Sequence, residues 1–219
     1  MMMTSDGDSG SEPGGAGTVG AVRGLALRQR LIESGLALIE RSGAQGLSLR
    51  EVARESGVSH MAPYGFFRSK NELLSAIAAA GFALFAERHA EASGAAGDSP
   101  RAQIINSLLA YVQFALERPR LLRLMIGGQI PADERCDELR AAYGKSFKHY
   151  TLVMATAMAR GELRAGDPAE AMFGAWSLVH GFTQLVLGRE FEAKLGATHE
   201  DIGATARRMI DIFLRGLAP

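Results

Sequence analysis

Helix-start signals recur along this chain and leave little room for other kinds of element. Ser48-Leu-Arg-Glu51 and Ser69-Lys-Asn-Glu72 each place a serine three residues before a glutamate, which is the pattern of a helix-capping box. Asp167-Pro-Ala-Glu170 combines an N-cap acid, a proline at the first helical position and an early glutamate. Ala and Leu number 60 against 18 for Val and Ile, and no Asn-Gly or Asp-Gly lies between alternating apolar runs. The sequence therefore predicts an all-α fold.

These signals divide the chain into helices joined by loops that contain Gly, Pro or Ser. The stretch 93–99, Ser-Gly-Ala-Ala-Gly-Asp-Ser, is the expected domain boundary. Residues 1–20 hold three acids, six glycines and no Lys or Arg, so we expect a disordered acidic tail there. The expected helices are 24–41, 49–56, 59–67, 69–92, 100–118, 119–126, 133–160, 168–188 and 199–217.

The formal charges balance, with 24 Lys and Arg against 24 Asp and Glu. This balance excludes a polybasic protein that coats nucleic acid through bulk charge, but it permits a local basic patch. Cys136 is the single cysteine, so the sequence favours a cytoplasmic protein without disulfides or a cysteine-based zinc site. Polar residues and glycines interrupt the uncharged stretch 171–188, so we expect a buried helix there and no membrane span.

Two short helices on either side of a glycine give the strongest functional signal. The expected helices 49–56 and 59–67 flank Gly57, as in a helix-turn-helix whose second helix enters the DNA major groove. An ordinary corner between two helices has the same spacing. Spacing alone therefore leaves both interpretations open.

The residues of this segment resemble the DNA-binding signature of the tetracycline-repressor (TetR) family of transcriptional regulators. The matching positions are Ser48, Val52-Ala53, Ser56-Gly57-Val58-Ser59, Tyr64 with Phe67, and Ser69-Lys70 with Leu73. The resemblance covers about residues 25–92. It implies an N-terminal helix-turn-helix domain at 21–70, joined by a long helix to a C-terminal helical effector-binding and dimerisation bundle within 71–219. Trp176-Ser-Leu-Val-His-Gly181 also resembles the Trp…His-Gly motif of one C-terminal subgroup.

The expected contacts with double-stranded operator DNA fall into two groups. Residues near the start of a recognition helix read base edges, and here these are Ser59, His60, Met61 and Ala62. The resemblance implies phosphate contacts for Tyr64 and Lys70, and the bracing helix offers two similarly placed residues, Ser48 and Arg50. A solvated surface position is the alternative for His60, and a core ring is the alternative for Tyr64.

Three residues of the expected recognition helix depart from the family pattern. Pro63 removes a backbone hydrogen bond and pushes Ala62 away from the α region, so the helix is expected to begin late or with a 3₁₀ turn. Gly65 lowers helix propensity by roughly 1 kcal/mol relative to Ala. Phe66 stands where a polar residue is usual in the family.

A homodimer follows from the resemblance and from the weak charge of the DNA-binding region. Residues 21–92 hold nine Arg or Lys and seven Asp or Glu, so binding must rely on a few phosphate contacts in each of two subunits. Helices 168–188 and 199–217 are expected to form a four-helix bundle with their symmetry mates. The expected interface residues are Gly174, Ser177, Gly181, Gln184, Ile210 and Phe213. For the small residues, a crowded contact inside one subunit is the alternative.

The C-terminal helices also hold many methionine and aromatic residues. At helical spacing such residues form either plain core or an apolar pocket with a few polar anchors. In the second case an apolar or aromatic effector would bind there and release the operator. The candidate pocket residues are Tyr111, Phe114, Met125, Tyr143, Phe147, Met154, Met158, Trp176 and His180.

Catalysis, cofactors and metals find little support in the sequence. The five histidines are scattered, no Gly-x-Ser-x-Gly elbow is present, and no Gly-Lys-Ser/Thr phosphate loop occurs. The expected function is that of a dimeric transcriptional regulator, most simply a repressor. One alternative is a helical small-molecule carrier or enzyme in which the helix-turn-helix is only structural, and another is an activator or a nucleoid-type DNA binder.

Overall fold

The computed structural model describes residues 15–188 and 199–219, and all regular elements within these residues are helices. The all-α prediction is therefore confirmed. The N-terminal elements, which we call the head, are α1 (Gly15–Ser42), α2 (Leu49–Glu55) and the 3₁₀ helix η1 (Ala62–Gly65). The remaining elements are α3 (Lys70–Gly94), α4 (Pro100–Glu117), α5 (Pro119–Ile126), the 3₁₀ helix η2 (Ala132–Glu134), α6 (Asp137–Ala159), α7 (Pro168–Leu187) and α9 (His199–Gly216).

Side-chain caps fix where several of these helices begin. The hydroxyl of Ser48 accepts a hydrogen bond from the Glu51 N–H at 3.2 Å, and the hydroxyl of Ser69 accepts from the Glu72 N–H at 3.1 Å. The Asp167 carboxylate accepts from the Ala169 N–H at 2.7 Å. Each cap satisfies a backbone donor that the first helical turn leaves free. The capping patterns in the sequence therefore predicted these three helix starts correctly.

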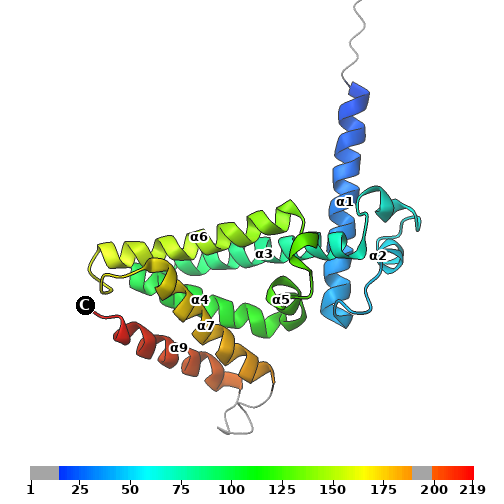
Figure 1. The fold of residues 1–219 in the computed structure, drawn as a ribbon. Helices are drawn as coiled ribbons and strands as arrows, with labels where there is room; N and C mark the ends of the chain where they lie inside the picture. The colour runs from blue at the N-terminus through cyan, green and yellow to red at the C-terminus, as the bar shows by residue number, and fades with distance from the viewer. Residues whose placement is uncertain (1–14, 189–198) are drawn as a thin grey trace, which may run out of the picture.

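The long helix α3 connects the head to the bundle (Figure 1). It packs against α1 at one end and against α4, α5 and α6 along its length. By length and composition α3 could cross a membrane, but 56% of its apolar stretch is buried inside the protein. It is therefore a core helix, and the two remaining long helices, α7 and α9, pack on α4 and on each other.

Two helix boundaries differ from the expected ones. The first helix begins at Gly15, so residues 15–20 are helical and do not belong to the expected tail, whereas residues 1–14 lie outside the described part of the chain. The helix expected at 133 begins at Asp137, because η2 occupies 132–134. The side chain of Asn71 donates to the Glu134 carboxylate at 2.8 Å and ties η2 to α3.

Candidate functional site

The head is built on a small apolar core that holds α2 and η1 against α1. Leu31, Ile39, Val52, Phe67 and Ile77 are all buried. Between α2 and η1 the chain turns at a glycine with a φ of +65°, a value that side chains disfavour. This turn brings η1 back across the head.

The recognition element is a single 3₁₀ turn and not the expected helix over 59–67. Pro63 is buried and has no N–H to donate, so the segment forms the shorter η1 over 62–65. The carbonyl of Pro63 accepts from the N–H groups of Phe66 and Phe67, both at 2.9 Å. The 3₁₀ turn that Pro63 was expected to cause is therefore present, whereas the longer helix over 59–67 is not.

The expected base-contacting residues lie on the surface of the head. Ser59, His60 and Met61 are exposed, whereas Ala62 is half-buried. Tyr64 is also exposed, so it is not the core ring that was the alternative. Arg50 is exposed on α2. These exposed side chains are free to meet a ligand as large as a DNA duplex.

The two other expected contacts already have partners within the chain. The Lys70 ammonium donates to the backbone carbonyl of Gln45 at 2.8 Å. The Ser48 hydroxyl donates to the Glu51 carboxylate at 3.2 Å in addition to its capping bond. Ser48 and Lys70 therefore shape the loop 43–48 and the starts of α2 and α3, whatever else they contact.

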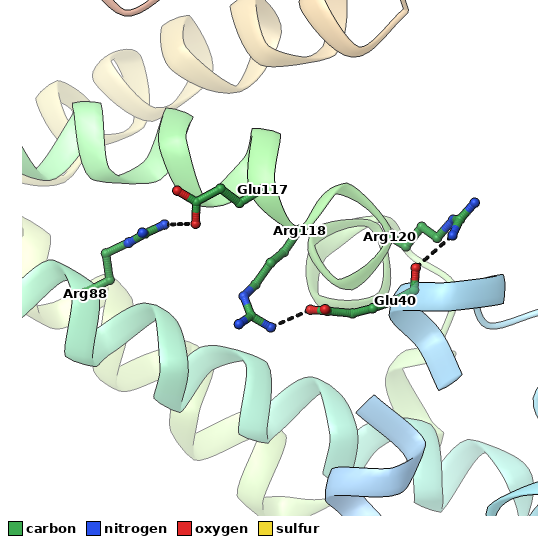
Figure 2. A network of polar contacts seen from close by, with 5 residues as sticks. All are labelled: Glu40, Arg88, Glu117, Arg118 and Arg120. Atoms are coloured by element: carbon green, nitrogen blue, oxygen red, sulfur yellow. Dashed lines mark hydrogen bonds and ion pairs between the residues drawn. The ribbon is translucent and has the colours of Figure 1, made fainter. Parts of the chain in front are cut away.

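One ion pair and two hydrogen bonds join the head to the bundle at the end of α1 (Figure 2). Arg118, which lies between α4 and α5, forms an ion pair with Glu40 of α1. Arg120 of α5 donates to the backbone carbonyl of Glu40 at 2.7 Å and to that of Arg41. These carbonyls lie in the last turn of α1, where the helix dipole favours a cation. The start of α5 is thereby fastened to the end of α1.

Two further ion pairs link neighbouring helices. Arg88 of α3 pairs with Glu117, the residue before Arg118 (Figure 2). Arg28 of α1 pairs with Glu138 of α6 at 2.7 Å. Each is exposed enough to contribute only about 0.2–1 kcal/mol. The sequence did not reveal these residues, because no local pattern marks partners that are far apart in the chain.

A cavity lies between α3, α4, α5, α6 and α7. The volume of this cavity is about 90 Å³, which is enough for several water molecules. Six of the candidate pocket residues line it: Tyr111, Met125, Tyr143, Phe147, Met154 and Trp176. Three others do not line it: Phe114 is buried in the core, Met158 is half-buried elsewhere, and His180 lies behind Tyr111.

Sequence reasoning missed the part of the cavity wall that α3 supplies. Phe82 and Phe85 line it from α3, and Tyr150, Phe173 and Ser146 line it from α6 and α7. The resemblance implies only a connecting role for this long helix. The spacing of Phe82, Phe85 and His89 on one face of that helix was a usable signal.

The surface that faces the cavity is almost entirely apolar, although five residues with hydroxyl groups line it: Ser107, Tyr111, Tyr143, Ser146 and Tyr150. The Tyr111 hydroxyl and His180 Nδ1 are joined by a hydrogen bond of 2.8 Å, and the His180 ring stacks on Trp176 with centroids 5.4 Å apart. Burial raises the pKa of Tyr111 well above its usual value and lowers the pKa of His180. Both groups are therefore neutral at pH 7, and the cavity suits an apolar molecule.

The expected dimer residues divide into exposed and buried sets. Ser177, Gly181 and Gln184 are exposed on α7. Ile210 is 0% exposed within the subunit, so it cannot contact a second copy. A Cβ at Gly174 would lie 3.1 Å from the Phe213 ring, so these two residues pack on each other within one subunit. The crowded internal contact that was the alternative for Gly174 is thus present, and a role for Gly174 in a dimer stays a prediction.

Among the described residues no group of three or more His, Cys, Asp or Glu is placed to hold a metal ion. The described residues thus offer two candidate sites, the exposed surface around η1 and the apolar cavity of the bundle.

Comparisons with known proteins match the head and the bundle to two separate family descriptions. Residues 31–77 match the family described as "Bacterial regulatory proteins, tetR family", and residues 104–213 match "Tetracyclin repressor-like, C-terminal domain". The chain is 28% identical over 111 residues to tetracycline repressor protein class D of Escherichia coli, which covers 51% of this chain and 47% of that protein. The match thus spans about half the length of this curated relative.

Solved structures share the whole fold. A Rhodococcus sp. RHA1 protein of unknown function is 32% identical with a TM-score of 0.77, and the match covers 88% of this chain and 96% of that one. The regulator FadR of Bacillus subtilis, in complex with stearoyl-CoA, has 14% identity and a TM-score of 0.68, with coverage of 86% and 98%. At that low identity, FadR shows the fold alone.

Proposed function

Because the chain belongs to the tetracycline-repressor family of bacterial regulatory proteins, we propose that it is a dimeric, sequence-specific DNA-binding regulator controlled by a small molecule. The proposal assigns operator recognition to the head and effector binding to the bundle cavity. We propose that the protein represses transcription and that it releases the operator when an effector fills the cavity. A regulator of this kind acts in the cytoplasm, where the DNA is.

The exposure of the residues around η1 is the observation that carries this proposal. His60, Met61 and Tyr64 have large exposed side chains on a segment whose backbone is fixed from below by the buried Pro63 and Phe67. Rigid presentation of side chains at the surface is what reading a base edge requires. We assign base contacts to Ser59, His60 and Met61, and phosphate contacts to Arg50, Tyr64 and Lys70.

The dimer in this proposal uses the exposed faces of α7 and α9. Ser177, Gly181 and Gln184 follow one another at helical spacing on α7. Leu185 on the same helix and Ile212 on the adjoining helix α9 are exposed large apolar residues. Small residues beside apolar ones allow two helix pairs to pack closely. Leu185 and Ile212 therefore replace Ile210 in the proposed interface.

The link between cavity and head runs through α5 in this proposal. Leu122, Met125 and Ile126 of α5 line the cavity, and Arg118 and Arg120 at its start hold the end of α1. A ligand that displaces α5 would move α1 and with it η1. In a dimer this changes the spacing of the two reading surfaces, which lowers the affinity for the operator.

A gel-shift assay on the DNA upstream of the protein's own gene tests the proposal. We expect a discrete complex and a short protected palindrome in a footprint. Arg50→Ala and Tyr64→Ala should weaken it at least tenfold, whereas the exposed Lys148→Ala on α6 should leave it unchanged. Unaltered binding in both head variants, with helicity intact, would overturn the proposal and favour a carrier or enzyme. Broad coating without a protected site would favour a nucleoid-type binder.

A further inference from the structure

A second space lies beside the cavity, in a groove between α3 and α6. The volume of this groove is about 400 Å³. The floor is apolar and consists mostly of alanine and phenylalanine from α3. The polar residues in its wall are His89, Lys145, Ser146, His149 and Tyr150.

The groove and the cavity are neighbours. Phe82, Phe85, Ser146 and Tyr150 line both of them, so at most one layer of side chains separates the two spaces. A molecule longer than the cavity could therefore extend between these side chains into the groove.

Two buried polar atoms at this boundary lack hydrogen-bond partners in the described part of the chain. These atoms are the Tyr150 hydroxyl oxygen and His89 Nε2. His89 is only 5% exposed, and its ring lies 4.5 Å from the Tyr150 ring, centroid to centroid. Buried polar groups almost always have a partner, and leaving one without a partner costs about 1–3 kcal/mol. Two such atoms at one boundary indicate a place built for a polar group of a ligand.

The charge around this place is positive. Lys145 is the charged residue in the described walls, and neither space is lined by a described Asp or Glu. The imidazole of His149 also lines the groove, with its ring centroid 4.7 Å from that of His89. Burial raises the pKa of the Tyr150 hydroxyl well above its usual value, so this hydroxyl keeps its proton and can donate it to an acceptor.

We propose that the effector is an amphiphilic monocarboxylate, with its hydrocarbon body in the cavity and its carboxylate in the α3–α6 groove beside Tyr150, His89 and Lys145. The carboxylate accepts hydrogen bonds from the Tyr150 hydroxyl and from the His89 tautomer that carries a proton on Nε2. Lys145 supplies a nearby positive charge at the open side of the groove. This inference rests on the proposed effector control of the regulator and specifies its ligand class.

A fluorescence titration of the full chain tests the inference, because Trp176 is the single tryptophan and lines the cavity. The probes are decanoate, 1-decanol and decyltrimethylammonium, which share one tail and differ in the head. Decanol is the most apolar, so a purely apolar cavity would bind it best. We expect decanoate to bind at least tenfold more tightly than the other two. Equal or tighter binding of decanol or of the cation overturns the inference, and so does the absence of any binding.

Variants locate the carboxylate. Tyr150→Phe removes only the hydroxyl and should weaken decanoate binding about tenfold, because a hydrogen bond to a charged group is lost. Lys145→Glu should weaken it about threefold or more, and Lys148→Glu, the same change on the same helix outside both spaces, should have no effect. If Tyr150→Phe and Lys145→Glu bind decanoate as the natural chain does, the carboxylate lies elsewhere and the inference is wrong.

The gel shift separates this inference from the proposed function. A chain that binds its operator but not decanoate would overturn only the ligand class. A chain that binds decanoate but no DNA would overturn the regulator. Binding of decanoyl-CoA without binding of decanoate would replace the carboxylate by a different head group and overturn the inference as stated.

Discussion

At the scale of single residues, His89 shows how burial sets a protonation state. Its ring is 5% exposed and packs between Phe85, His149 and Tyr150. Burial, and secondarily the charge of His149, lowers the pKa of His89 from 6.5 to about 4. The folded protein therefore holds this side chain neutral at pH 7 and resists its protonation.

This burial makes folding stability depend on pH. The unfolded chain takes up a proton at His89 near pH 6.5, and the folded chain takes one up only near pH 4. The stability that neutral His89 contributes to the folded state is therefore complete above pH 6.5 and is lost as the pH falls from 6.5 to 4. The loss reaches up to about 3 kcal/mol, at about 1.4 kcal/mol per unit of pKa difference. In urea unfolding at pH 7 and pH 4.5, His89→Phe should lose much of the acid destabilisation. The exposed His60→Phe serves as the control, and identical pH profiles in all three proteins would contradict the assignment.

Lys70 allows a residue-scale test of the proposed phosphate contacts. Each lost phosphate contact lowers the slope of log affinity against log salt by about 0.9, and a Lys70→Met dimer loses two. The slope from gel shifts at several salt concentrations should therefore fall by about 2. Because Lys70 also holds the Gln45 carbonyl, thermal unfolding must accompany the assay. An unchanged slope would leave the lysine with its structural role alone.

At the scale of elements, α1 contains one glycine in a crowded position and one in an open position. A Cβ at Gly35 would lie 2.5 Å from Cδ1 of Ile77 on α3, and Ile77 is buried, whereas nothing lies within 4 Å of a Cβ at Gly24. Gly35→Ala should lower the free energy of unfolding by about 1–3 kcal/mol through overpacking. Gly24→Ala, the same change on the same helix, should raise it by up to about 1 kcal/mol. Denaturant unfolding of both variants checks the prediction, and two shifts of the same sign would contradict it.

The elements themselves could largely be predicted from the sequence, because their causes are local. The hydroxyl of a serine or the carboxylate of an aspartate caps a backbone N–H two or three residues further along the chain. Ser48, Ser69 and Asp167 therefore marked true helix starts. Pro63 likewise signalled the 3₁₀ turn. The cavity could be predicted only in part, since Phe82, Tyr150 and Ser146 meet through the packing of α3 on α6, and no short window of sequence contains that information.

At the scale of the whole molecule, the junction of α5 with α1 should transmit the state of the cavity. Ala175→Phe fills the cavity from α7 and should weaken operator binding about fivefold or more without any effector. Arg118→Ala breaks the ion pair with Glu40 and should reduce that effect in the double variant. Gel shifts on the two single variants and the double variant measure the coupling. Strict additivity of the two changes would argue against transmission along this path.

The oligomeric state is a second property of the whole molecule. Leu185 is 52% exposed and Ile212 is 68% exposed on the faces of α7 and α9 assigned to the dimer. Leu185→Glu and Ile212→Glu should convert the dimer to monomers in sedimentation velocity, because a buried unpaired charge opposes association. Leu152→Glu on α6, where the native side chain is 65% exposed, should leave the dimer intact. Dimers in all three variants would place the interface elsewhere.

The brevity of η1 has a consequence for how such a protein would find its target in a genome. Because η1 is so short, the base contacts are assigned to the three residues just before it, Ser59, His60 and Met61. Three residues span at most about 10 Å, or about three base-pair steps of 3.4 Å, so each subunit can inspect very little sequence. So few letters recur by chance many times in a bacterial chromosome. The distance between two short half-sites must then supply much of the specificity. Inserting one base pair between the half-sites would therefore weaken operator binding more than altering most of its bases.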